Sequence, residues 1–316
     1  MKLNIASTLA LASVAALAIG GALVAAPAQK PGSNLAKVLA DPIRPPEDVA
    51  RDADRKPAEL LAFAGVRNGM TIAELAPGGG YFTRILTGVV GPSGHVYAIT
   101  GRPSPALQEL AQKRFNLTVV AASPGTIPVP GQVDLVWTTL NYHDFKNNKL
   151  PSGGDAAQSY DAEAFKALKP GGVYLIVDHE AAAGAGATQT STLHRIEDSV
   201  VRREVEAAGF KLDSESNLLR HPADDHTAKV QESGIRGKTD QFILKFRKPR
   251  QASELLPRRA VEDFVDVDIV RLLDREGDAA AERVGGDGSL GVIAFEHGRG
   301  SRLRDARREF AGHRAR

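Results

Sequence analysis

The chain has 316 residues, of which 42% are hydrophobic and 25% are charged, as in an ordinary globular protein. Its net charge is only +2, which argues against binding of a polyanion by the chain as a whole, so no nucleic-acid partner is expected. Because the chain has no cysteine, disulfides, zinc–thiolate sites and cysteine nucleophiles are excluded.

The first 28 residues have the pattern of a signal peptide. A basic Lys2 precedes an alanine-rich apolar run, and Ala26-Pro27-Ala28 places small residues at the two positions that a signal peptidase reads. We therefore expect residues 1–28 to be removed and the protein to be exported, into a periplasm. An uncleaved membrane anchor is the alternative. No later segment has the length and apolarity of a membrane span.

Residues 29–55 are polar, charged and rich in proline, which favours an extended arm. From residue 56 onward, strand-length apolar runs alternate with helical stretches, which predicts a mostly parallel sheet covered by helices on both faces. The predicted helices are 56–64, 81–90, 104–114, 161–168 and 193–208. The predicted strands are 71–75, 96–99, 117–121, 133–138, 173–177, 210–212 and 242–246.

The composition changes after Pro249. Residues 251–316 contain 12 arginines and no lysine, and only 260–273 could form an amphipathic helix. We interpret this segment as a disordered or atypical extension outside a domain of residues 56–250. A basic nucleic-acid-binding tail and a frame-shifted read-through of GC-rich DNA are the alternatives.

Three consecutive glycines, 78–80, lie between a predicted strand and a predicted helix. Such a turn lets a ligand approach the backbone closely and meet the free N–H groups of the helix. A Walker loop is excluded because Tyr81 follows Gly80, and a dinucleotide loop lacks its third glycine because Thr83 stands there. An S-adenosylmethionine loop remains, with a purely structural turn as the alternative.

The motifs along residues 56–249 resemble those of class I S-adenosylmethionine-dependent methyltransferases. The matching segments are ELAPGGG (74–80), GQVDLVWTTLNYHDF (131–145), ALKPGGVYLIVDHE (167–180), EAAGF (206–210) and KTDQFILKFRKP (238–249). More narrowly, NYHD, DHE, LHRIE and RGKTDQF resemble a bacterial group of predicted methyltransferases that carry export signals.

This resemblance implies a Rossmann-like seven-stranded sheet of order 3-2-1-4-5-7-6, with the last strand antiparallel. It also implies S-adenosylmethionine as the cofactor, bound where strands 1 and 4 meet. Thr100 stands where the class usually has an acid for the ribose, and Ser123 stands near the adenine position. The implied cofactor-binding residues are Glu74, Ala76, Gly78, Gly79, Gly80, Tyr81, Thr100, Ser123 and Asn141.

Polar residues follow two strands that would be neighbours in this sheet. Residues 141–144 follow the fourth strand and residues 178–180 follow the fifth. We expect His143 to act as a general base, oriented by Asp144 or Asp178. Loop and helix capping is the alternative for each residue.

A metal site is the other chemical interpretation of these residues, but no helical metal-binding spacing supports it, and none is predicted. It would draw on His143, Asp144, Asp178, His179, Glu180 and His194.

The sequence thus favours methyl transfer from S-adenosylmethionine to a small molecule. The alternative is an exported, non-catalytic binding protein on the same scaffold. We expect the loop 146–159 to shape the acceptor pocket and residues 221–226 to form a solvated loop. The acceptor and the oligomeric state are left open.

Overall fold

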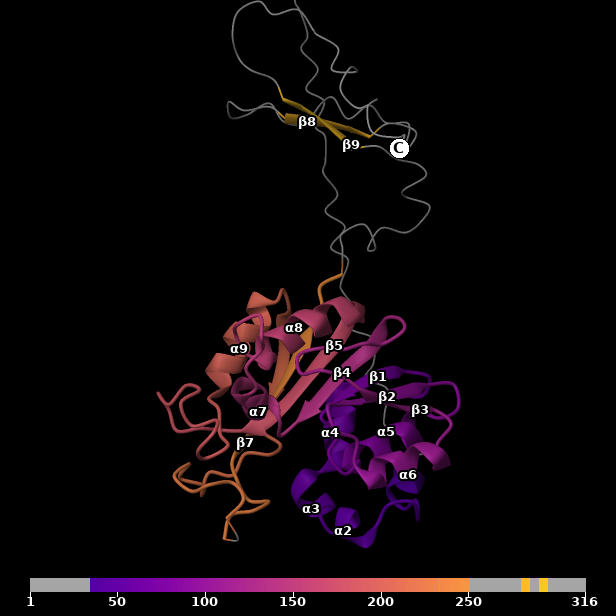
Figure 1. The fold of residues 1–316 in the computed structure, drawn as a ribbon, viewed down its shortest axis with the longest axis vertical. Helices are drawn as coiled ribbons and strands as arrows, with labels where there is room; N and C mark the ends of the chain where they lie inside the picture. Colours follow the sequence, from indigo (N-terminus) through magenta and orange to yellow (C-terminus); the bar gives the residue numbers. More distant parts are fainter. Residues whose placement is uncertain (1–34, 233, 251–279, 285–289, 295–316) are drawn as a thin grey trace, which may run out of the picture. The chain divides into compact units, whose positions relative to one another are not determined.

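The computed structural model describes residues 35–232, 234–250, 280–284 and 290–294 (Figure 1). The chain divides into two units, residues 1–249 and 250–316, and each is described by itself. The predicted signal peptide and the predicted helix 260–273 lie outside the described residues. In the described part of the chain, no helix has the length and apolarity needed to cross a membrane.

A seven-stranded sheet forms the centre of the first unit, in the order β3-β2-β1-β4-β5-β7-β6. β7 runs antiparallel to both β5 and β6, and the other pairs are parallel. The predicted fold class and strand order are therefore confirmed. The strands are β1 (Thr71–Leu75), β2 (His95–Thr100), β3 (Leu117–Ala121), β4 (Val133–Thr139), β5 (Leu168–His179), β6 (Lys211–Ser216) and β7 (Gln241–Arg247).

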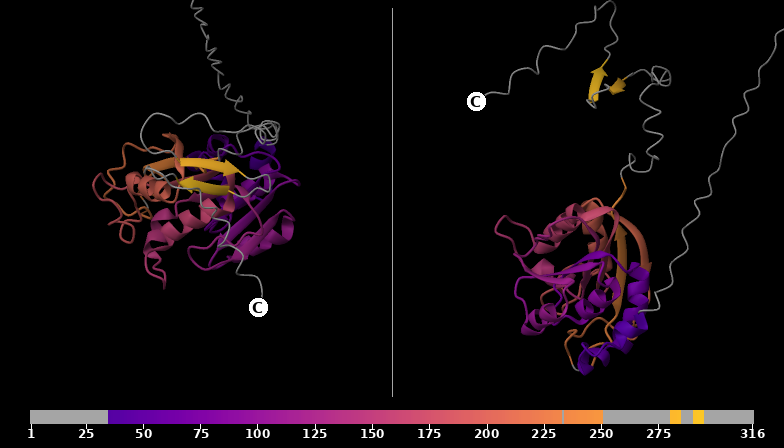
Figure 2. Two further views of the ribbon diagram at one scale, coloured as in Figure 1. Left: turned by 90° about the horizontal axis from the view of Figure 1, so that it is seen from above. Right: turned by 90° about the vertical axis from the view of Figure 1, so that its right-hand side faces the viewer.

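Helices cover both faces of this sheet (Figure 2). One face packs against α1 (Leu35–Leu39), α4 (Pro57–Ala64), α5 (Tyr81–Val90) and α6 (Pro105–Lys113). The other face packs against α7 (Tyr142–Asn147), α8 (Ala156–Ala167) and α9 (Asp198–Ala207). The strand residues alternate between two separate apolar clusters, as the period of two in a strand requires.

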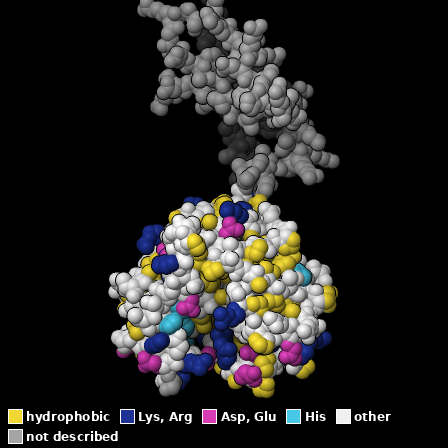
Figure 3. Space-filling model, in the orientation of Figure 1, with side chains coloured by type: hydrophobic (Ala, Val, Ile, Leu, Met, Phe, Trp, Pro, Cys, Tyr) yellow, Lys and Arg dark blue, Asp and Glu magenta, His cyan; other side chains and the backbone are white. Residues whose placement is uncertain are grey.

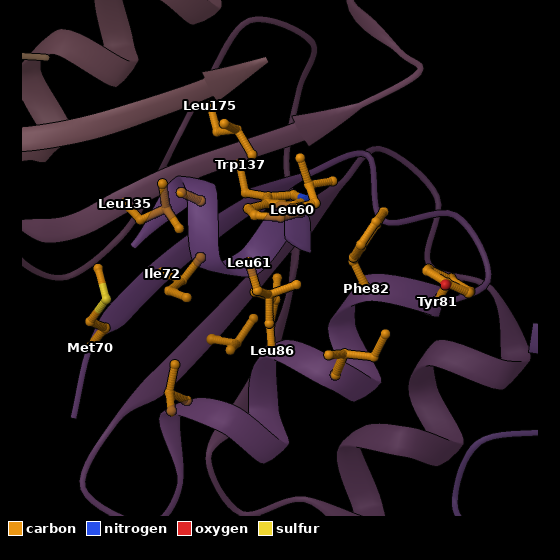
Figure 4. Packing of buried hydrophobic residues seen from close by; sticks show 14 of the residues in the cluster. Leu60, Leu61, Met70, Ile72, Tyr81, Phe82, Leu86, Leu135, Trp137 and Leu175 are labelled. Carbon is orange, nitrogen blue, oxygen red and sulfur yellow. The ribbon is translucent and has the colours of Figure 1, made fainter. Parts of the chain in front are cut away.

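Trp137 of β4 lies at the centre of the first cluster and is fully buried. Its ring lies 5.0 Å from that of Phe82 in α5, and Leu60 of α4 packs in the same cluster (Figure 4). These contacts fix α4 and α5 to the strands that carry the glycine turn. The packing of this core therefore sets the position of the glycine turn between β1 and α5.

The N-terminal arm is helical, so the prediction of an extended arm at 29–55 was wrong for its described part. α1, α2 (Pro46–Val49) and α3 (Asp52–Arg55) occupy it. Ion pairs that could not be read from the sequence hold these helices in place. Arg84 of α5 pairs with Asp48 at 2.9 Å, and Arg44 pairs with Asp52. The proline-rich spacing keeps each helix to four or five residues.

Two predicted helices begin five residues away from the observed ones. α8 starts five residues before the predicted 161, because the side chain of Asp155 caps it by accepting from the Gln158 N–H. α9 starts at Asp198 rather than at 193. The carboxylate of Glu197 accepts the N–H groups of Gly184 and Gly186, which holds the preceding residues in a loop.

The second unit contains a two-stranded antiparallel sheet of β8 (Ala280–Val284) and β9 (Leu290–Ala294). The sequence analysis expected no strand in residues 251–316. The hairpin pairs five residues on each side, from Ala280 with Ala294 to Val284 with Leu290. The rest of this segment after residue 250 is outside the described residues.

Candidate functional site

The glycine turn joins β1 to α5 with an unusual backbone. Ala76, Gly78 and Gly80 all have positive φ angles, of 50°, 57° and 86°. A Cβ at Gly78 would have no atom within 4 Å, so the residue faces open space. Beside the turn lies a pocket of about 200 Å³. It is lined by Asp48, Arg51, Arg55, Glu74, Ala76, Pro77, Gly78, Gly79, Tyr81, Phe82, Thr139, Leu140 and Asn141.

Glu74, near the end of β1, places a buried carboxyl in this pocket. It is 3% exposed, and the hydroxyl of Thr83 donates a 2.6 Å hydrogen bond to it. Burial raises the pKa of Glu74 to about 7, although Thr83 and the nearby cations Arg55 and Arg84 act in the opposite direction. A cationic ligand would stabilise the ionised form.

The short helices α2 and α3 form one wall of the same pocket. The hydroxyl of Tyr81 donates a 2.6 Å hydrogen bond to Asp52, which ties α3 to the start of α5. The Arg55 guanidinium lies 4.6 Å from the centre of the Tyr81 ring. Burial lowers the pKa of Arg55 to about 10, with Arg51 contributing in the same direction.

A larger pocket of about 640 Å³ adjoins the first and shares Arg51, Arg55 and Leu140 with it. Its volume is within the range of ligand sites, about 300–1,000 Å³. Figure 3 shows basic, acidic and histidine side chains gathered on one face of this unit. The remaining lining residues are Glu47, Asp54, His143, Asp144, His179, Val230, Gln231, Arg236, Gly237 and Gln241.

His143 and Asp178 form a buried pair behind the larger pocket. Nδ1 of His143 lies 2.7 Å from one oxygen of Asp178, and the backbone N–H of His143 donates to the other oxygen at 2.7 Å. Burial would lower the pKa of His143, but the Asp178 carboxylate raises it above the ordinary value. Because Asp178 holds Nδ1, the ring presents Nε2 on its other side.

The neighbours of this pair are held by other partners. Nδ1 of His179 lies 2.8 Å from the Thr239 hydroxyl, and burial lowers the pKa of His179 to about 4, so its ring is neutral at pH 7. Glu180 accepts the N–H of Asp198 at the start of α9 and also pairs with Arg220. The loop-capping interpretation therefore holds for Glu180.

The structure brings most of the predicted site residues together. Six of the predicted cofactor residues line the smaller pocket: Glu74, Ala76, Gly78, Gly79, Tyr81 and Asn141.

The amide of Asn141 also donates to the carbonyl of Ala76 at 3.2 Å, which joins the end of β4 to the glycine turn. Gly80, Thr100 and Ser123 line neither pocket, and their cofactor contacts stay predictions.

Sequence reasoning missed two of the following features and named the other, His194, only as a member of a metal set that was not predicted. Arg51 and Arg55 reach both pockets from helices that the sequence did not reveal. His194 lies next to Asp144, with 3.3 Å between Nδ1 and the carboxylate. The loop 221–226 is not fully solvated, because the side chain of Asp224 is 2% exposed and pairs with the buried Arg195. The charge of Asp224 is the only sequence signal for that last pair.

The chain was compared with known proteins. No protein-family model and no curated protein matches it. An S-adenosylmethionine-dependent methyltransferase from Aquifex aeolicus is 18% identical over 69% of this chain and 100% of its own, with a TM-score of 0.47. A putative sarcosine dimethylglycine methyltransferase from Galdieria sulphuraria is 18% identical over 65% and 87%, with a TM-score of 0.48.

The [4+2]-cyclase SpnF is 15% identical over 63% of this chain and 82% of its own, with a TM-score of 0.49. The similar structures thus include a protein named for a reaction other than methyl transfer. Identities and TM-scores this low carry no statement about the activity of this chain. The fold itself rests on the strand order and pairing described above.

Proposed function

We propose that this chain transfers a methyl group from S-adenosylmethionine to a small-molecule acceptor. The observation that carries the proposal is the junction of the two pockets at the ends of β1 and β4, where Arg51, Arg55 and Leu140 line both. In sheets of this kind, ligands bind at the carboxyl ends of the strands where the strand order reverses. A donor in one pocket and an acceptor in the other would therefore meet at this junction.

The lining of the smaller pocket suits part of the donor, because its volume of about 200 Å³ is below the range of about 300–1,000 Å³ for a whole ligand. The open backbone at Gly78 and the N–H groups at the start of α5 suit a ligand that needs close approach and polar contacts. The carboxyl of Glu74 suits the positive charges of S-adenosylmethionine, an ammonium and a sulfonium. The carbonyl of Ala76, already bound to Asn141, helps to hold the turn open.

The larger pocket fits the acceptor. Nε2 of His143 faces this pocket with its ring oriented by Asp178, and Asp144 lies beside it. Bound beside this pocket, S-adenosylmethionine would supply a methyl group to the acceptor's nucleophilic atom, with its carbon–sulfur bond broken and a thioether left. The acceptor's proton passes to Nε2 of His143. Since the sulfonium is already activated, orientation supplies most of the remaining acceleration.

Transfer of label tests this proposal. The mature protein is incubated with methyl-labelled S-adenosylmethionine and a small-molecule extract of the organism that makes it. We expect labelled small molecules, with a yield about 10²–10⁴-fold lower for His143→Ala than for the wild type. His221→Ala, outside both pockets, is the matched control. Transfer that survives His143→Ala contradicts the role of His143, and binding without transfer supports the non-catalytic alternative.

We also propose that the protein is exported after removal of residues 1–28. The support is the sequence pattern that ends at Ala28. Mass spectrometry of the protein from its own host should find Gln29 at the N-terminus. Recovery of the chain with Met1 intact from the cytosol would contradict export.

A further inference from the structure

His143, Asp144 and His194 converge beside the larger pocket. Nε2 of His143 lies 3.4 Å from an oxygen of Asp144, and Nδ1 of His194 lies 3.3 Å from the same oxygen. The three potential ligand atoms all lie within 4.8 Å of one another. Ligand atoms at 2.0–2.2 Å from a shared tetrahedral ion are separated by about 3.3–3.6 Å. The observed separations from Asp144 fit that geometry.

The two contacts with Asp144 lie at ion-pair distance but are longer than strong hydrogen bonds. Both distances exceed the length of a charge-assisted hydrogen bond, about 2.7–2.9 Å. Nδ1 of His194 is buried and has no hydrogen-bond partner among the described residues. A buried ring nitrogen without a partner costs free energy, and a ligand that accepts its lone pair would recover that cost.

The neighbouring residues already orient these side chains for binding a metal ion. Asp178 holds Nδ1 of His143 at 2.7 Å, which leaves Nε2 as the ligand atom, and a carboxylate behind a histidine is the usual outer support of a metal ligand. His194 has a φ of 58°, a conformation that a non-glycine residue adopts at a cost. The strained backbone belongs to a loop residue whose imidazole ring contacts Asp144.

We propose that His143, Asp144 and His194 bind one divalent transition-metal ion. Two imidazole nitrogens and one carboxylate oxygen favour ions such as Zn²⁺, Fe²⁺ or Co²⁺ over Mg²⁺ and Ca²⁺, which prefer oxygen alone. Three protein ligands leave a coordination position open, and His143 and Asp144 line the larger pocket, so that position faces the acceptor.

The metal site does not depend on methyl transfer. An ion on Nε2 of His143 takes the lone pair that the metal-free protein offers to the acceptor's proton. His143 can therefore act as the base only in the metal-free protein; in the metal-bound protein an acceptor oxygen would bind the ion, which lowers the pKa of that oxygen so that its proton is released to water. No metal was predicted from the sequence because no helical metal-binding spacing supports one; two of the ligands are adjacent, and the third is 50 residues away.

Cobalt titration tests the site. The mature protein, freed of metal by a chelator, is titrated with Co²⁺ in the absence of S-adenosylmethionine, and the visible absorption of bound Co²⁺ is measured. We expect saturation at one equivalent, displacement by Zn²⁺, and no displacement by the same concentration of Mg²⁺. Asp178→Asn should weaken Co²⁺ binding by about 10–100-fold.

A matched pair of variants completes the test. His194→Asn removes the imidazole while keeping a residue that tolerates a positive φ. His226→Asn is the control, because His226 has a φ of 63° and its side chain is 25% exposed, against 23% for His194. We expect His194→Asn to lose the absorption and His226→Asn to keep it, with both variants folded by circular dichroism.

Co²⁺ binding by the wild type that is no stronger than that of His194→Asn would overturn the proposal. Equal loss in His226→Asn would do the same. Because the titration contains no S-adenosylmethionine, its outcome is separate from that of the methyl-transfer assay.

Discussion

Glu74 has a buried carboxyl that lowers the stability of the folded protein at high pH and can bind a cationic ligand. Its carboxyl is buried at the smaller pocket near the end of β1, and its pKa is raised from 4.5 to about 7. The unfolded chain releases this proton near pH 4.5, whereas the folded chain keeps it until about pH 7. Stability therefore falls as the pH rises through this window, because the folded state holds the extra proton.

Glu74→Gln should remove this pH dependence. The amide keeps an oxygen that can accept from Thr83 but carries no charge. We expect the variant to be more stable than the wild type at pH 8, by up to about 3 kcal/mol, and nearly equal to it at pH 4.5. Urea unfolding at the two pH values measures the difference. An equal difference at both pH values would show that the carboxyl is not the cause.

The same substitution should weaken cofactor binding. If the carboxylate contacts a positive charge of S-adenosylmethionine, Glu74→Gln loses a charge-assisted hydrogen bond. We then expect the affinity for the cofactor at pH 8 to fall by about tenfold or more. Calorimetry of the two proteins measures it. A variant that is more stable and binds as well as the wild type would leave Glu74 without a role in the pocket.

At the level of elements, α2 and α3 line both pockets, and a buried ion pair holds α2 against α5. Arg84 and Asp48 have side chains that are each 9% exposed. Asp48→Ala would leave the guanidinium of Arg84 without its carboxylate, although the carbonyl of Gly79 still accepts from it. Removal of one partner of a buried pair costs about 3–5 kcal/mol.

We therefore expect Asp48→Ala to lower the free energy of unfolding by about 3 kcal/mol and to weaken ligand binding at the glycine turn. The control is Glu109→Ala, which breaks a pair with Lys113 on the surface of α6 and should leave unfolding unchanged. Urea unfolding compares the two. A similar small effect for both variants would show that α2 is not held by this ion pair.

These helices also show where prediction from the sequence ended. The strands and the turn at 78–80 followed from local patterns, namely strand-length apolar runs and glycines at a strand–helix junction, whereas the sheet order was implied by the family resemblance. α2 and α3 are too short to have a periodic pattern, and ion pairs with distant residues order them.

The candidate site likewise contains residues that could be predicted from the sequence and a contact that could not. His143 and Asp178 could be predicted because each follows a predicted strand, and the family resemblance implied that these two strands are neighbours, as they are in the structure. His194 was named only as a possible metal ligand, and its place beside Asp144 could not be predicted, because it lies in a loop between Glu180 and α9 that no periodicity describes. The contact of that loop with Asp144 is a tertiary contact, and a lone histidine carries no signal for it.

At the scale of the whole molecule, the first unit is complete without the C-terminal segment. β7 pairs with β5 and β6 along its length and ends at Arg247, just before Pro249. A stop after Arg250 should therefore leave the melting temperature and the cofactor affinity of the protein unchanged. Thermal unfolding and calorimetry of the two lengths test this. A truncated protein that unfolds or aggregates would place an integral element after residue 250.

Binding of the donor at the glycine turn is the central claim, and calorimetry with S-adenosylhomocysteine tests it most directly. Gly78→Val would place a branched side chain in the space beside the turn. Gly184→Val is the control, since Gly184 also has a positive φ and no atom within 4 Å of its Cβ position. We predict saturable one-to-one binding by the wild type and Gly184→Val, and none by a folded Gly78→Val. The absence of binding by the wild type, or equal binding by a folded Gly78→Val, would contradict the account.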